Sequence, residues 1–160
     1  MSDDGPVKLL DLTRLVSRTG LAFTGVGRVE PAYLTHLPEF GPLFGLLRTN
    51  LGYLLLDGDG CRDLARRIAA QDWGRRDLLS RLRRRDAPLR ARAESDMRRI
   101  ALDRCTYSGL GRMLRRHLPR GVQYFNVGNT RLARGFWTAL DRCGAVSTGM
   151  VHDTIPIDPP

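Results

Sequence analysis

Residues whose types and spacing could perform chemistry occur in three short segments of the sequence. They are Thr24, Gly25, Val26, Gly27 and Arg28 in the first segment, Asn126, Gly128 and Asn129 in the second, and His152 and Asp153 in the third. Each segment follows an apolar run that is typical of a buried strand. In a parallel sheet, loops of this kind gather at the carboxyl ends of the strands, where helix N-termini attract anions. The three segments are therefore candidates for ligand binding.

The first segment, residues 24–28, has two glycines that allow the backbone to approach an anionic ligand or a sugar closely. It lacks the dinucleotide-binding fingerprint, because Gly-x-Gly-x-x-Gly would need a third glycine where this chain has Glu30. A loop with a purely structural role is the alternative.

The second and third segments each have a functional and a structural interpretation. Asn129 or Thr130 would cap the helix that follows, and capping alone is sufficient to explain them. His152 comes just after an apolar strand, where an imidazole can bind a substrate hydroxyl or act as a general base. A histidine that is simply hydrogen-bonded at the surface or in the core is the alternative.

No metal site is expected from the sequence. Asp57-Gly58-Asp59 has the form Asp-x-Asp, but two aspartates beside two glycines before a helix are typical of a turn and cap. His36 and His117 have no companion ligands at a suitable spacing, and the three cysteines form no Cys-x-x-Cys pair. The signatures of serine hydrolases and of P-loop proteins do not occur in the sequence.

The positive charge is concentrated in the middle of the chain. The net charge is +9 with a single lysine, and residues 62–120 hold 18 arginines against seven acidic residues. Such a segment is typical of a solvated helical face, an anionic membrane surface or a nucleic-acid interface. Nucleic acid is the least favoured partner, because the stretch between Arg75 and Arg104 has no aromatic residue for base stacking.

The apolar pattern predicts a Rossmann-like three-layer α/β domain with a mainly parallel sheet and an arginine-rich helical segment. Strands are predicted at 7–12, 122–127 and 145–151, and a hairpin at 43–47 and 53–56. Helices are predicted from Val26 to Leu37, over 61–70, from Leu89 to Arg104, from Leu110 to Leu118, and from Leu132 to Leu140. Asp59 or Gly60 is the expected cap of the second helix, and arginines are expected on the outward faces of the third and fourth.

The chain of 160 residues suits one domain. It divides into a first βα part with the hairpin (7–60), the basic helical segment (61–120) and a strand-helix-strand unit (121–160). Three scattered cysteines and the lack of an apolar run of about 18 residues favour a cytoplasmic protein.

Four stretches together resemble the amino-terminal half of the glycosyltransferases of family 4, also described as group 1 glycosyl transferases. They are Asp11-Leu12-Thr13-Arg14-Leu15, Thr24-Gly25-Val26-Gly27-Arg28-Val29-Glu30, Tyr124-Phe125-Asn126-Val127-Gly128, and Val151-His152-Asp153-Thr154-Ile155-Pro156-Ile157 with Pro159. The resemblance implies one half of a GT-B fold and a retaining enzyme that moves a hexose from a nucleotide-sugar to a glycan or lipid-linked acceptor. It implies no metal or other cofactor. The charge of the basic segment separately predicts peripheral docking on the anionic inner face of the membrane.

The resemblance also assigns roles to residues. Thr24, Gly25, Val26 and Gly27 match the loop beside the donor phosphates, and His152, followed by Asp153, matches the histidine beside the transferred sugar. The donor-binding domain of the family, with its Glu-x₇-Glu motif, has no counterpart here, so we expect no turnover from this chain alone. The alternatives are an arginine-rich binding module for nucleic acid or a protein partner, and a solitary domain without activity.

Overall fold

Strand β1 (Val7–Asp11) lies inside a six-stranded sheet with the order β4-β3-β2-β1-β5-β6. The other strands are β2 (Leu43–Thr49), β3 (Gly52–Leu56), β4 (Asp103–Cys105), β5 (Val122–Asn126) and β6 (Val146–Gly149). The structure is a computed structural model, which describes residues 7–21, 28–82, 87–128 and 133–149. Strands β2, β1, β5 and β6 are parallel, and β3 runs antiparallel to both of its neighbours.

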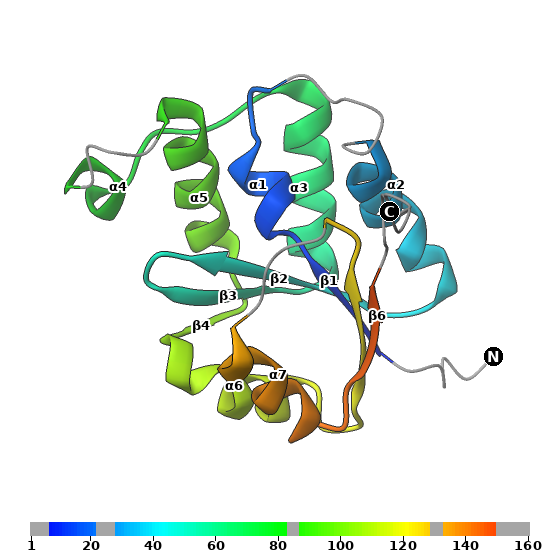
Figure 1. Cartoon of the computed structure of the whole chain (residues 1–160). Coiled ribbons are helices and arrows are strands. Elements are labelled where there is room, and N and C mark those ends of the chain that lie inside the picture. Colours follow the sequence, from blue (N-terminus) through cyan, green and yellow to red (C-terminus); the bar gives the residue numbers. More distant parts are fainter. Residues whose placement is uncertain (1–6, 22–27, 83–86, 129–132, 150–160) are drawn as a thin grey trace, which may run out of the picture.

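Helices cover both faces of this sheet, as the layers of Figure 1 show. One face carries α1 (Thr13–Ser17), α2 (Val29–His36), α3 (Gly58–Ala70) and α5 (Pro88–Ile100), with α4 (Leu78–Leu82) beside α5. The other face carries α6 (Leu110–His117) and α7 (Arg134–Asp141). Short 3₁₀ segments at Leu37–Phe40 and Tyr107–Gly109 complete the described elements. Of the helices in these ranges, none is long and apolar enough to cross a bilayer.

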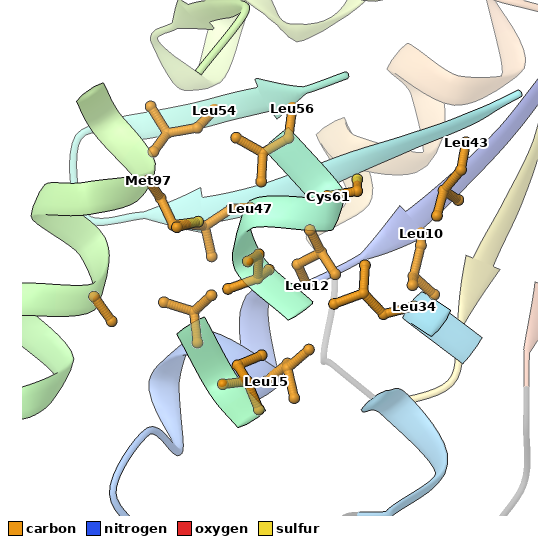
Figure 2. Packing of buried hydrophobic residues seen from close by; sticks show 14 of the residues in the cluster. Leu10, Leu12, Leu15, Leu34, Leu43, Leu47, Leu54, Leu56, Cys61 and Met97 are labelled. Atoms are coloured by element: carbon orange, nitrogen blue, oxygen red, sulfur yellow. The ribbon is translucent and has the colours of Figure 1, made fainter. Parts of the chain in front are cut away.

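The alternation of side chains along β1 divides the core into two clusters. Leu10 points toward α1, α2 and α3, where it joins Leu12, Leu34 and Leu64, and Figure 2 shows much of this cluster. Leu9 points to the opposite face and joins Tyr124 and other residues beneath α6 and α7. Because successive strand residues face opposite sides, one apolar strand contributes to both cores.

The structure confirms the hairpin, the α/β character and the positions of the main strands along the chain, with helices on both faces of a mostly parallel sheet. The prediction missed the short elements α1, α4 and β4. It was wrong to extend a helical pattern to Arg104, because this residue lies in β4 and pairs with Leu54. Elements of three to five residues are too short to show a clear period in the sequence.

The prediction that arginines lie only on the outward face of α5 was also wrong. The side chain of Arg98 is 9% exposed, and its Nε donates to Asp77 Oδ2 at 2.6 Å. Asp96 is buried too, where its Oδ2 accepts from Gly74 N at 2.7 Å and from Arg67 Nη1 at 3.0 Å. The segment that leads from α3 to α4 thus packs over the polar side of α5 and is held there by charge-assisted hydrogen bonds.

The cap of α3 is Asp57, which corrects the expectation of Asp59 or Gly60. The Asp57 carboxylate accepts from Gly60 N at 2.9 Å, whereas Asp59 lies within the helix and pairs with Arg62 at the surface. An aspartate at this position accepts a hydrogen bond from an N–H that has no partner within the helix. The Asp-x-Asp pattern is therefore explained by the start of a helix.

We expect Asp57→Ala to lower the free energy of unfolding by about 1 kcal/mol, because the cap hydrogen bond is lost. Asp59→Ala is the matched control, since its side chain is 84% exposed and its ion pair should contribute less than about 0.5 kcal/mol. Urea unfolding followed by circular dichroism measures both. Equal losses for the two variants would contradict the assignment of Asp57 as the cap.

Candidate functional site

The carboxyl ends of β1 and β5 form the point where the strand order of the sheet reverses. From β1, the chain goes to β2 on one side, while β5 and β6 lie on the other side. Open α/β sheets bind ligands outside the carboxyl ends of the strands at such a point. In the sequence, the predicted segment at 24–28 comes after β1 and α1, and those at 126–130 and 152–153 come after β5 and β6; these three strands are parallel neighbours in the sheet.

Asp11 ends β1 and connects the sheet to α1. It is 3% exposed, and its Oδ1 accepts from Thr13 N at 2.8 Å while its Oδ2 accepts from Tyr124 OH at 2.7 Å. Thr13 Oγ1 in turn accepts from Arg48 N of β2 at 3.0 Å. These hydrogen bonds join the ends of β1, β2 and β5, so the edge is held together by polar contacts.

Burial raises the pKa of Asp11 above its ordinary value, and the hydrogen bonds from Thr13 and Tyr124 oppose part of this shift. Burial, together with the nearby Asp11, also raises the pKa of Tyr124, so its phenol keeps its proton and remains a donor. Both oxygens of Asp11 are engaged and the residue is almost inaccessible. We therefore assign Asp11 a positioning role at this edge.

Arg14, Glu30 and Gly128 meet between α1, the start of α2 and the loop after β5, and we call these three residues the edge cluster. Arg14 Nη1 lies 3.9 Å from Glu30 Oε2 and donates to the carbonyl oxygen of Gly128 at 3.4 Å. The Glu30 side chain is 3% exposed, whereas the Arg14 side chain is 22% exposed. The guanidinium thus connects α1, the first turn of α2 and the loop after β5, and it partly faces solvent.

Gly128 is required in the edge cluster because of its small size. A Cβ atom at this position would lie 2.2 Å from Glu30 Oε1 and 3.1 Å from Arg14 Cβ. Such close contacts would force the buried carboxylate or the loop to move. The backbone of the loop after β5 can therefore approach α2 closely only while residue 128 has no side chain.

Two of the predicted site residues lie near the end of β5, whereas a third lies at a different cavity. Gly128 is buried in the edge cluster, and Asn126 is half-buried at the end of β5. Arg28 is exposed at the start of α2 and lines a different feature, a cavity of about 430 Å³ between α2 and α3. Thr24, Gly25, Val26, Gly27, Asn129, His152 and Asp153 lie outside the described residues.

The sequence-based list of site residues omitted Asp11, Arg14, Glu30 and Tyr124. For Asp11 a signal was present, because a lone carboxylate at the end of an apolar strand lies where ligand sites form. Glu30 carried no such signal, since a glutamate in the first turn of a helix is usually explained by the helix dipole. Its burial follows only from the packing of α2 against the loop after β5.

The arrangement offers hydrogen-bond donors at the rim of the sheet edge. The half-buried Arg14, Arg48 and Asn126 can donate to hydroxyl or phosphate oxygens, which suits a sugar or an anionic ligand. Within the ranges that the structure describes, no three histidine, cysteine or acidic side chains gather as a metal site would require.

Comparisons with protein-family models, with curated proteins and with solved structures gave no match to this chain.

We expect the buried Asp11 to make stability depend on pH. Because its pKa is raised above 3.8 in the folded protein, its contribution to stability is complete below that pH and is lost as the pH rises through the raised pKa. Asparagine does not titrate, so the free energy of unfolding of the wild type minus that of Asp11→Asn should fall between pH 3.8 and neutral pH. Urea unfolding at a series of pH values measures this difference.

Asp77→Asn is the control for this experiment. Hydrogen bonds from Arg98 lower the pKa of Asp77, so its contribution is present above pH 3.8 and is lost only as the pH falls further. The corresponding difference for Asp77→Asn should therefore stay constant where that for Asp11→Asn falls. A constant difference for Asp11→Asn would mean that Asp11 titrates alike in the folded and unfolded protein.

Proposed function

We propose that this chain is the acceptor-side half of a retaining glycosyltransferase, which moves a hexose from a nucleotide-sugar to a glycan or lipid-linked acceptor. One observation carries the proposal. Strands β1, β5 and β6, which precede the three segments with family-like motifs, are adjacent and parallel, and the strand order of the sheet reverses between β1 and β5. That is the edge at which α/β proteins of this type bind ligands.

In this proposal the residues have distinct roles. The backbone of Thr24, Gly25, Val26 and Gly27 faces the donor phosphates, and His152 with Asp153 lies beside the transferred sugar. Arg14 and Asn126, which are half-buried near the carboxyl ends of β1 and β5, donate hydrogen bonds to acceptor hydroxyls. During transfer, the bond from the anomeric carbon to the donor phosphate breaks, a bond to the acceptor oxygen forms, and the hydroxyl proton goes to the departing phosphate.

The binding-module alternative receives less support from the basic segment. Arg67 of α3 and Arg98 and Arg99 of α5 are paired with aspartates or glutamates. Guanidiniums that are already neutralised in this way contribute little to the attraction of nucleic-acid phosphates. These pairs compensate part of the positive charge of α3 and α5 within the protein.

The acceptor role can be tested with a panel of methyl hexosides and short glycans added to the isotope-labelled chain. We expect amide resonances of Arg14, Asn126 and Gly128 to shift, and Gly128→Ala to weaken the binding by about tenfold because Glu30 is displaced. Gly149→Ala at the end of β6 is the matched control, since a Cβ there meets no atom within 4 Å. If Gly128→Ala remains folded and binds as the wild type does, the edge cluster has no role in acceptor binding.

We also expect that the purified chain transfers no sugar by itself, because the proposed enzyme needs a donor-binding domain. A radiolabelled sugar-transfer assay, with several nucleotide-sugars and the same acceptor panel, measures this directly. Abundant product from the chain alone would contradict its assignment as one half of a two-domain enzyme.

A further inference from the structure

A groove of about 500 Å³ is lined mainly by residues of α6, of α7 and of the 3₁₀ segment Tyr107–Gly109, and no residue of the edge cluster is among those that line it. We call it the arginine groove. Its lining includes Arg112, Arg115, Arg142, Tyr107, Phe136 and Gly135. None of the described residues that line it is acidic.

The three arginines gather where α6 and α7 come together. A Cβ on Gly111 of α6 would lie 3.8 Å from Ala139 Cβ of α7, and Cys143 Sγ lies 3.6 Å from the Gly111 carbonyl oxygen. Arg115 Nη1 lies 3.4 Å from the same Cβ position, so its side chain folds back along α6 over this contact. Arg112 directly follows Gly111 in the sequence, and Arg142 directly precedes Cys143.

The arginines of the groove have no acidic partner among the residues that the structure describes. The side chains of Arg112, Arg115 and Arg142 form no ion pair or hydrogen bond with the described residues. Arg116 on the same helix behaves differently, since its Nη1 lies 3.3 Å from Asp103 Oδ2. Arg112 and Arg115 are neighbours on one side of a helix, where like charges repel each other. An anion in the groove would remove this repulsion.

An aromatic wall adds a second recognition element to the arginine groove. Tyr107 is 53% exposed, and its hydroxyl donates to the carbonyl oxygen of Thr49. Its ring stands edge-on to the buried ring of Tyr53, with the centroids 5.5 Å apart and an interplanar angle of 85°. The ring is thus held in place, and a fixed exposed ring is suited to stack on a planar group.

We propose that the arginine groove binds a small organic phosphate whose phosphate groups contact Arg112, Arg115 and Arg142 and whose planar ring lies against Tyr107. Guanidinium groups match the geometry of phosphate oxygens, and the volume of the groove is in the range of small-ligand sites. A nucleoside diphosphate combines these two chemical features. This site does not depend on the proposed function.

The test uses isothermal titration calorimetry on the full chain at low salt with ADP, pyrophosphate and adenosine as probes. We expect ADP to bind more tightly than pyrophosphate, and adenosine to bind most weakly. Arg112→Ala and Arg115→Ala should each weaken ADP binding by about tenfold, the effect of losing one charge-assisted hydrogen bond. Tyr107→Ala should weaken the binding of ADP but leave that of pyrophosphate unchanged.

Two further variants separate a specific site from general attraction by charge. Arg116→Ala removes the same charge from the same helix outside the groove lining, so ADP binding should change less than about twofold. Gly135→Glu places a carboxylate at the groove without a clash, because a Cβ there meets no atom within 4 Å. It should abolish ADP binding while thermal unfolding stays unchanged.

The outcomes that would overturn the proposal are specific. Equal losses for Arg116→Ala and Arg112→Ala would mean that ADP binds only through the overall positive charge. Absence of binding by both ADP and pyrophosphate would reject the site. Binding to vesicles of phosphatidylglycerol that depends on Arg112 and Arg115, without binding of ADP, would assign the groove to a lipid surface. Hexoside binding at Gly128 that is unaffected by Arg112→Ala would leave the proposed function intact in each case.

Discussion

Strand β1 is hydrogen-bonded to β2 on one side and to β5 on the other, and this central position determines how the other strands and the helices are arranged around it. Leu9 and Leu10 are almost completely buried on opposite faces, so both faces must be covered by helices. Because parallel neighbours need crossover connections, the chain passes over one face to reach β2. The reversal of strand order beside β1 then brings the end of this strand next to the end of β5.

The polar contacts at the carboxyl end of β1 also depend on its pairing with β5. Tyr124 reaches Asp11 because Tyr124 is paired with Leu9, two residues earlier on the same face of β1. The tyrosine also packs against Phe136 of α7, with the ring centroids 5.3 Å apart. One side chain thus connects the apolar core beneath α7 with the polar rim of the sheet.

The strongly basic composition has two different structural meanings. On α3 and α5 the arginines meet aspartates and glutamates: Arg67 joins α3 to Asp96 of α5, and Arg98 joins α5 to Asp77 in the segment that leads to α4. On α6 and after α7, Arg112, Arg115 and Arg142 have no such partners among the described residues. Charge that is internal to the fold stabilises packing, whereas charge left uncompensated at a groove is available to a ligand.

The sequence by itself determined the α/β class, the hairpin and the positions of the main strands along the chain. These features follow from local apolar periodicity and turn residues, which a sequence shows directly. Only the tertiary structure decided that Glu30 is buried beside Arg14 and Gly128, and that Arg98 is buried while Arg112 is not. Such differences arise from contacts between distant segments, because whether a charged side chain is buried and paired depends on what packs against it.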